Sequence, residues 1–393
     1  MTASLAGRLR RLWLDVHLWI GVGLLVALLP LAVSGSILVW HDALDRVLHS
    51  ARYEVSGPVR LPVSAYAQVA EGAFAGTATL SQVRLPENAG DPVVAVGRLK
   101  GPGGPGGRPR NLNVWIDPPT GKVLAVADVS QSFTMWMHRF HGTLNIPNIG
   151  RKVVGWLGWA MFVSCATGLW LWWPRNNAFL KALRWRRGPS KLFNLHHMVG
   201  FWVCAPLAVL SLTGVYISFP QTSRALFGVA QPEARSDNVG RPRNGQPSRG
   251  GPGGRFAPPI DNPRLSFDVV AASAIAAAPD ARLASVSVPT RGAPEPVWRV
   301  QLRRPGVKEP TAVQVSDATG EARPDRGVPG GRQPDPISRL MRQVHDGAGT
   351  GPIWQTIIFL SGIAPAVLGV TGVVMWLRRR ARRLAMTKRM AAG

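Results

Sequence analysis

The chain offers eight histidines, at positions 17, 41, 49, 138, 141, 196, 197 and 345. Imidazole is the commonest protein ligand for transition metals and for haem iron. Spacing separates these histidines into groups. His17 is followed by Gly21 and Ser34-Gly35, and His196 is followed, at identical spacings, by Gly200 and Thr213-Gly214. The two histidines therefore begin copies of one pattern.

A second pattern begins at His141 and His345. His141 is followed by Thr167-Gly168, Trp172 and Arg175, and His345 by Thr371-Gly372, Trp376 and Arg379, again at identical spacings. Agreement over so long a stretch is not expected of two unrelated apolar segments. His138 and His197 have no histidine at the corresponding positions. We expect His41 and His49 to be solvated or hydrogen-bonded.

The repeat pairs His17 with His196 and His141 with His345. A twofold axis between two copies would bring equivalent residues face to face, which is what the two axial ligands of a six-coordinate haem iron require. We therefore predict two haem b groups, one held by each histidine pair. Zinc or copper is the alternative, but zinc sites usually add carboxylate or cysteine ligands.

Gly21 and Gly200 follow their histidines by one helical turn, so they lie on the same helix face as the predicted ligands. A position without a side chain would let a flat macrocycle approach the helix. Close packing between helices explains a glycine there equally well. Both glycines are predicted cofactor-binding residues.

Four apolar runs are long enough to position these histidines in a membrane: Val16–Trp40, Val153–Trp173, Met198–Phe219 and Ile353–Leu377. About 20 residues at 1.5 Å per residue cross a hydrocarbon core of roughly 30 Å. The sequence therefore predicts an α-helical membrane protein with four transmembrane helices arranged as two parallel repeats. Histidine-bearing segments lead into the second and fourth helices, within residues 136–174 and 338–377.

The formal charge of +25 is concentrated in short segments. Residues 1–15, 174–195 and 378–393 together carry 16 basic residues and one acidic residue. The two long connections are nearly balanced. The positive-inside rule places both termini and the 175–195 loop in the cytoplasm and the long connections outside. We predict a bacterial inner-membrane protein with contacts to membrane lipid and no nucleic-acid partner. Tryptophans near the helix ends, including Trp172 and Trp376, are expected in the membrane interface.

The long connections, residues 41–135 and 220–337, each contain one small α+β module. In the first, a helix over Ser64–Ala75 precedes strands over Thr79–Leu85, Pro92–Leu99, Leu112–Ile116 and Val123–Val126. In the second, a helix over Ser266–Ala278 precedes strands over Leu283–Val288, Val297–Leu302 and Ala312–Val315, with a short return. Gly/Pro/Arg tracts at 101–110, 240–259 and 323–336 are expected to be flexible. Both cysteines, Cys165 and Cys204, fall inside spans and are expected to be small buried residues.

Four motifs resemble the PepSY-associated transmembrane family, the iron-regulated membrane proteins: His17-Leu-Trp-Ile-Gly21, His141-Gly-Thr-Leu144, Leu195-His196-His-Met-Val-Gly-Phe-Trp202 and His345-Asp-Gly347. The resemblance covers nearly the whole chain. It implies four helices, PepSY-like periplasmic modules and haem-dependent reduction of ferric siderophores. The Gly/Pro/Arg insertions and the aspartate after His345 depart from the family pattern.

The chain is therefore expected to be a di-haem electron-transfer protein that reduces a periplasmic ferric siderophore or similar iron chelate. The electron donor, a quinol or a cytoplasmic reductant, is not identified by the sequence. Arg139 and Arg151 could attract an anionic chelate, but interfacial anchoring is the simpler explanation for Arg151. One alternative function is a membrane-anchored module that binds a peptide, a protein or a lipid. A transporter built from parallel repeats is the other.

Overall fold

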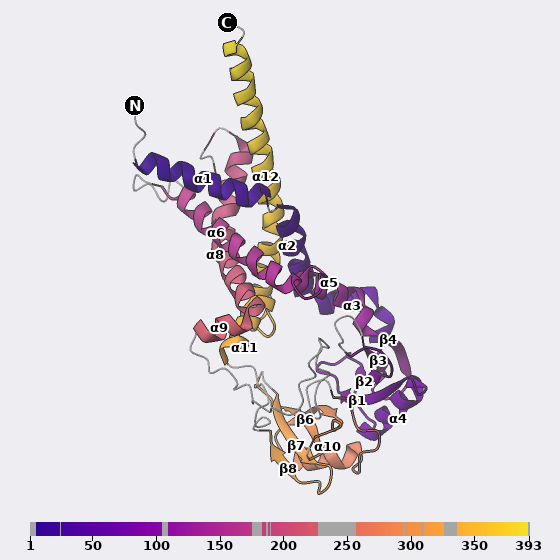
Figure 1. Cartoon of the computed structure of the whole chain (residues 1–393). Coiled ribbons are helices and arrows are strands. Elements are labelled where there is room, and N and C mark those ends of the chain that lie inside the picture. Colours follow the sequence, from indigo (N-terminus) through magenta and orange to yellow (C-terminus); the bar gives the residue numbers. More distant parts are fainter. Residues whose placement is uncertain are drawn as a thin grey trace. The chain divides into compact units, whose positions relative to one another are not determined.

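The computed structural model describes residues 5–23, 25–103, 109–174, 183–185, 188, 190–226, 257–293, 295–307, 310–325 and 336–391. The chain divides into two compact units (Figure 1). Met1–His41, Trp136–Gln231 and Pro334–Gly393 form one, which we call the membrane unit. Asp42–Met135 and Pro232–Gln333 form the other, which we call the sheet unit.

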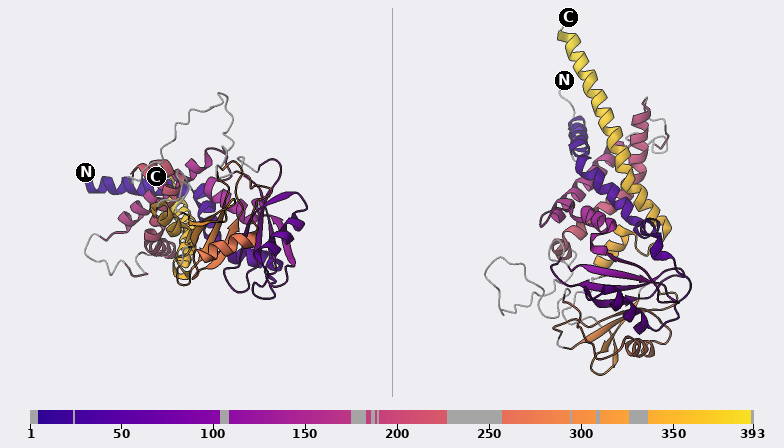
Figure 2. Two further views of the ribbon diagram at one scale, coloured as in Figure 1. Left: turned by 90° about the horizontal axis from the view of Figure 1, so that it is seen from below. Right: turned by 90° about the vertical axis from the view of Figure 1, so that its right-hand side faces the viewer.

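The membrane unit is helical. Its helices are α1 (Leu5–Gly23), α2 (Leu25–Val39), α5 (Phe133–Thr143), α6 (Gly150–Trp172), α8 (Lys191–Ser218), α9 (Pro220–Leu226), α11 (Pro336–Asp346) and α12 (Pro352–Ala391). Among the described residues, α6, α8 and α12 are each long and apolar enough to cross a membrane. The long α12 continues through the basic C-terminal segment and extends past the other helices of this unit (Figures 1 and 2).

The first expected span, 16–40, is not one straight helix. The segments Gly7–Gly23 and Leu25–Val39 meet at an angle of 69° (Figure 1). Gly21 and Gly23 precede the bend, and glycine is a poor helix former because it loses more conformational freedom than other residues. The described helices therefore provide three spans, or four if the bent pair crosses as one.

Small residues allow the helices of the membrane unit to approach closely. α6 packs against α8, and α12 packs against both α2 and α8. A Cβ on Gly362 of α12 would lie 2.7 Å from the carbonyl oxygen of Ala32 in α2. At the same crossing, the hydroxyl of Ser36 donates to the carbonyl of Phe359 at 2.8 Å. Glycine contacts and hydroxyl hydrogen bonds of this kind are typical of packed membrane helices.

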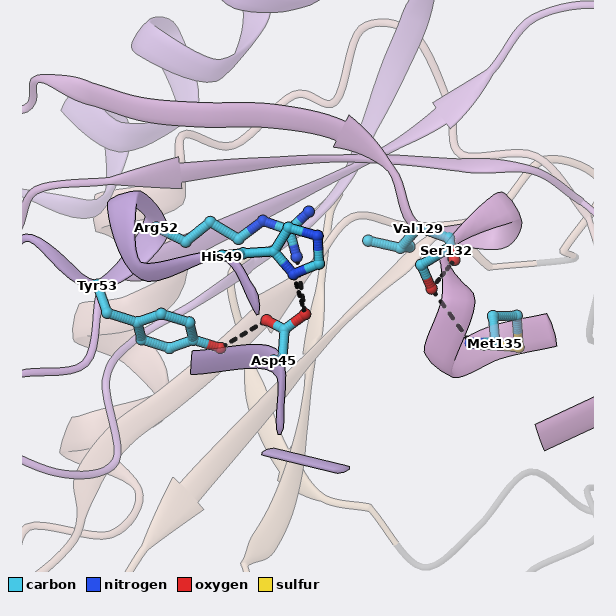
Figure 3. A network of polar contacts seen from close by, with 7 residues as sticks. All are labelled: Asp45, His49, Arg52, Tyr53, Val129, Ser132 and Met135. Carbon is cyan, nitrogen blue, oxygen red and sulfur yellow. Dashed lines mark hydrogen bonds and ion pairs between the residues drawn. The ribbon is translucent and has the colours of Figure 1, made fainter. Parts of the chain in front are cut away.

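Two short helices, α5 and α11, precede the spans α6 and α12 and carry a histidine in their last turn. The Oγ of Ser132 accepts a hydrogen bond from the backbone N–H of Met135 at 3.2 Å, which caps the start of α5 (Figure 3). After α5, Leu144 and Asn145 adopt positive φ values of 51° and 55°. The chain therefore turns between His141 and the start of α6.

The sheet unit contains the expected strands. They are β1 (Ala78–Arg84), β2 (Val93–Leu99), β3 (Asn111–Ile116), β4 (Val123–Asp128), β5 (Arg282–Ser287), β6 (Val297–Arg303), β7 (Thr311–Ser316) and β8 (Ala322–Pro324). The expected helices are α4 (Val63–Phe74) and α10 (Phe267–Ala276). The unit also has α3 (His41–Leu48) and the 3-10 turns η1 (Ser50–Tyr53) and η3 (Val129–Gln131).

The two modules share one eight-stranded antiparallel sheet, in the order β4-β3-β2-β1-β5-β6-β7-β8. Val83 of β1 lies opposite Val286 of β5 at the junction. Pairing these two strands removes two exposed sheet edges, because each would be an edge strand in an isolated module. The core is also shared, since α4 contacts α10 and one buried cluster includes Tyr66, Phe74 and Trp298.

Parts of the three Gly/Pro/Arg tracts and of the 175–195 loop lie outside the described residues: 104–108, 175–182, 186–187, 189, 240–256 and 326–335.

Candidate functional site

Two histidine pairs meet in the membrane unit. His17 of α1 and His196 of α8 form the first pair, with ring centres 6.4 Å apart and ring planes perpendicular. His141 of α5 and His345 of α11 form the second pair, with ring centres 6.1 Å apart and planes inclined by 41°. These are the two pairings that the sequence repeat predicts, and each joins residues about 180 to 200 positions apart.

Hydrogen bonds fix the tautomer of all four imidazoles. The Nδ1 atoms of His17, His141 and His345 lie 2.9–3.1 Å from the backbone carbonyls of Ser164, Leu31 and Leu210, respectively. A carbonyl only accepts, so Nδ1 carries the proton and donates it.

The fourth imidazole, that of His196, meets a hydroxyl. Its Nδ1 lies 2.9 Å from the Oγ1 of Thr371, and that hydroxyl donates to the carbonyl of Val367 at 2.7 Å. The hydroxyl therefore accepts from His196. In a neutral ring of this tautomer Nε2 keeps its lone pair, which is the arrangement that histidine ligands of metals show.

A hydroxyl and a glycine accompany every one of these rings. Nδ1 lies 3.1 Å from Thr167 in His17, 3.0 Å from Thr213 in His345 and 3.2 Å from Ser34 in His141. The glycine that follows each hydroxyl residue leaves room for the ring. A Cβ on Gly35 would lie 2.7 Å from Cε1 of His141, and one on Gly214 would lie 3.0 Å from Cε1 of His345.

These Ser-Gly and Thr-Gly pairs are functional candidates that sequence reasoning missed. The pairs are Ser34-Gly35, Thr167-Gly168, Thr213-Gly214 and Thr371-Gly372. Each pair follows a histidine in the sequence at one of two fixed spacings. These spacings indicated the repeat, and they also indicated that the four pairs share a role. The sequence does not show which helices face each other. Each Ser-Gly or Thr-Gly pair contacts a histidine of another helix, so the contacts could not be predicted from spacing.

A cavity of about 750 Å³ lies beside the first histidine pair and is lined by both rings. Its size falls within the range of pockets that bind small molecules and cofactors. Gly21 and Gly200 also line it. Outside its own helix backbone, a Cβ on Gly21 would meet no described atom within 4 Å, so this glycine faces open space. A Cβ on Gly200 would lie 3.7 Å from a side-chain carbon of Leu368, which is an ordinary contact distance.

The other histidines have different surroundings. His138 is exposed on α5. His197 lines the cavity, where its ring packs edge-on against Phe193 with the centres 3.9 Å apart. His41 is exposed, and its Nδ1 lies 3.0 Å from the carbonyl of Leu38.

His49 belongs to a polar network in the sheet unit, centred on the carboxylate of Asp45 (Figure 3). His49 Nδ1 lies 3.0 Å from Asp45, and Arg52 and Tyr53 donate to the same carboxylate at 2.9 and 2.8 Å. Burial and the negative charge of Asp45 raise the pKa of Tyr53 to about 12. The guanidinium of Arg52 also stacks on the Trp115 ring, at 4.2 Å. These contacts anchor η1 to the sheet.

Several further residues have structural surroundings. Arg151 donates to the carbonyl of Ile217 at 3.0 Å, which ties α6 to α8. Trp172 is not exposed at a helix end, as an interfacial belt would require. It is buried, and its ring stacks on Phe201 with the centres 4.1 Å apart. Cys165 and Cys204 are free and buried, and the Cys204 thiol donates to the Cys165 carbonyl at 3.2 Å.

Within the described residues, no group of three or more His, Cys, Asp or Glu side chains is arranged to hold a metal ion. The possible metal ligands that lie close together are the two pairs of imidazoles. A pair suits a metal ion that receives its remaining ligands from a macrocycle, whereas a zinc site needs three or four protein ligands.

Comparison with known proteins identifies the family. No curated protein matches the chain. A family model described as "PepSY-associated TM region" matches residues 14–379, which include both histidine pairs and the whole sheet unit. The chain therefore belongs to the PepSY-associated transmembrane family.

Proposed function

We propose that this protein is an inner-membrane electron-transfer protein that holds two haem b groups and reduces a periplasmic ferric siderophore or a similar iron chelate. The observation that carries the proposal is the pair of facing imidazoles at each of two places in the membrane unit. Family membership supports a membrane protein of the iron-regulated kind.

The separation of the rings fits a shared metal ion. A metal–imidazole bond is about 2 Å long, and a ring nitrogen lies about 1.2 Å from the ring centre, so two imidazoles on opposite sides of one ion have centres about 6.3 Å apart. The observed distances are 6.4 and 6.1 Å. Because every Nδ1 is already donating, Nε2 is the nitrogen available to the iron.

The surroundings of the first pair fit haem in particular. A flat macrocycle needs space beside the ligands, and the cavity of about 750 Å³ lined by His17 and His196 provides it. Gly21 contributes open space rather than a side chain. Haem bound here would supply one-electron chemistry, and the protein would set its potential through the axial histidines and their hydrogen bonds.

The two pairs lie toward opposite ends of the same helix. His196 of the first pair is on α8, and His345 of the second pair bonds Thr213, further along α8. At 1.5 Å per residue, His196 and Thr213 are separated by about 25 Å along the helix axis, which is most of a bilayer core. The positive-inside rule puts the first pair at the cytoplasmic side and the second at the periplasmic side. A cytoplasmic reductant or a quinol would supply the electron.

The reaction requires one electron for each iron. Fe(III) in the chelate accepts the electron and becomes Fe(II), which siderophores bind far more weakly, so the metal is released. In this scheme the four histidines hold and orient the redox groups, and the sheet unit on the periplasmic side would receive the chelate.

Spectroscopy of the full chain, expressed with ample haem, tests the proposal. The expected protein is red, with the Soret and the α and β bands of low-spin haem. After reduction by dithionite, anaerobic mixing with a ferric siderophore should reoxidise the haem, and a colorimetric ferrous chelator should detect the released iron. A colourless chain would contradict the proposal and favour a binding module. A red chain that no ferric chelate reoxidises would contradict the reductase activity.

A further inference from the structure

The cavity beside His17 and His196 carries positive charge at one end. Arg10 and Arg11 of α1 and Arg379 of α12 line it. Its described lining residues include no aspartate or glutamate. The three guanidinium groups therefore have no acidic counterpart in the cavity, and an anionic ligand group would provide one.

Helix geometry directs Arg10 and Arg379 toward the first histidine pair, and Arg11 is a further lining residue of the same cavity. Arg10 precedes His17 by seven residues, which is two helical turns, so both lie on one face of α1 about 10 Å apart. Arg379 follows Gly372 by the same seven residues on α12. A Cβ on Gly372 would lie 3.5 Å from Cε1 of His196, so this face of α12 also meets the pair.

The rest of the lining is mainly apolar and aromatic. Phe201 and Trp376 contribute rings, and Leu28 and Leu207 are among several leucines. Arginines at one end of an apolar cavity fit an amphipathic ligand with an apolar body and an anionic edge. Haem has this shape, because its two propionate carboxylates project from one edge of the macrocycle.

We propose that Arg10, Arg11 and Arg379 bind the propionate carboxylates of the haem that His17 and His196 hold. The inference rests on the proposed function, because it requires a haem at this pair. It adds the residues that orient the macrocycle within the cavity and that raise its reduction potential. The positive charges stabilise the reduced haem, which carries one more electron than the oxidised form.

The simpler explanation of these arginines is the positive-inside rule, by which cytoplasmic segments are rich in Lys and Arg. Under that rule only the number of positive charges matters, and their position in the cavity does not. The chain offers a matched control. Arg8, Arg378 and Arg382 belong to the same terminal segments and do not line the cavity. Substituting either set by glutamine removes three positive charges from the same two segments.

The first experiment is a potentiometric titration of the full chain in detergent, followed by visible absorption. It uses a His141→Ala background, so that only the first pair holds haem. In the R10Q/R11Q/R379Q variant, the ratio of reduced to oxidised haem at a fixed potential should fall about tenfold, or 59 mV for one electron. The R8Q/R378Q/R382Q variant should keep the potential of the parent.

The second experiment tests whether the anion belongs to haem or to a lipid headgroup. Full-length chain made under haem limitation is loaded with haemin or with haemin dimethyl ester, which lacks both carboxylates. The parent should bind the ester about tenfold more weakly than haemin, and R10Q/R11Q/R379Q should bind both equally. Equal binding by the parent would show that the arginines hold another anion, and would overturn the inference.

The outcomes also separate this inference from the proposed function. A parent chain without haem contradicts the proposed function and, with it, the inference. A chain that holds haem with the same potential in both triple variants leaves the proposed function intact and overturns the role of the arginines.

Discussion

The hydroxyl of Thr213 lies 3.0 Å from Nδ1 of His345. It also donates to the carbonyl of Val209 at 2.9 Å, so it accepts from the imidazole. Removing it should loosen the ring that we assign to the second haem. In the Thr213→Val variant, haem affinity at this pair should fall about tenfold to a hundredfold, as it does when outer hydrogen-bond partners of metal ligands are lost. Haem transfer to an acceptor protein measures the change.

A matched control is Thr356→Val, which removes a hydroxyl that donates to the carbonyl of Pro352 within its own helix and has no other hydrogen bond among the described residues. This variant should retain haem as the parent does. Equal haem loss from both variants would show that Thr213 acts through helix stability and not through His345.

The glycines beside the rings give a steric prediction. A Cβ on Gly35 would lie 2.7 Å from Cε1 of His141, closer than carbon atoms normally approach. Gly35→Ala should displace the imidazole at a cost of about 1–3 kcal/mol and reduce haem content at the second pair. Gly142→Ala is the control, since a Cβ there meets no described atom within 4 Å outside its own helix backbone. Normal haem content in Gly35→Ala would contradict the proposed position of the ring.

In the sheet unit, Gly97 of β2 lies directly over the ring of Phe74, a fully buried residue of α4. A Cβ at position 97 would overlap that ring. Gly97→Ala should lower the free energy of unfolding by about 1–3 kcal/mol, measured by denaturant unfolding. Gly72 lies in the same helix as Phe74, and a Cβ there meets no described atom within 4 Å outside its own helix backbone, so Gly72→Ala should not destabilise the unit. An unchanged midpoint for Gly97→Ala would contradict this packing.

Asp117, at the turn after β3, gives a pH prediction. Burial alone would raise its pKa, but hydrogen bonds from Ser56 and Thr120 and the charge of Lys122 lower the pKa below its usual 3.8. A lowered pKa in the folded state stabilises the fold above the unfolded-state pKa, and this stabilisation is lost as the pH falls through the folded-state pKa.

Asp117→Asn should therefore destabilise the protein at pH 7 by about 1–3 kcal/mol, and the difference from wild type should shrink below about pH 4. Thermal unfolding of the full chain, followed by its sheet signal in circular dichroism, measures this. Asp280→Asn changes an exposed aspartate and serves as the control. A difference that stays constant with pH would contradict the role of the charge.

Local patterns predicted the elements of the sheet unit because the alternation of apolar and polar residues is visible in the sequence. Trp298, Val300 and Leu302 of β6 are fully buried and alternate with the exposed Arg299 and Gln301, as the period of two requires. The joining of β1 to β5 was not predictable in this way. Their pairing is a contact between residues about 200 positions apart, and each strand looks the same whether its edge is paired or open.

The histidine pairs were predictable because the repeat aligns His17 with His196 and His141 with His345. The bend before Leu25 and the separate helices α5 and α11 were not predictable. Apolar composition shows that a segment can cross a membrane, but it does not show where the helix bends or breaks. The cavity also depends on how α1, α8 and α12 meet, so the approach of Arg379 to the first pair is visible only in three dimensions.

The number of haems per mole of full chain in single-histidine variants, determined by pyridine haemochrome assay, tests most directly whether each histidine pair holds one haem. Wild type should contain two. His17→Ala and His196→Ala should each remove one haem, and His141→Ala and His345→Ala should each remove the other. His138→Ala and His197→Ala should keep both. Loss of a haem from His138→Ala with full retention in His141→Ala would contradict the pairing, and a wild-type chain without haem would contradict the proposed function.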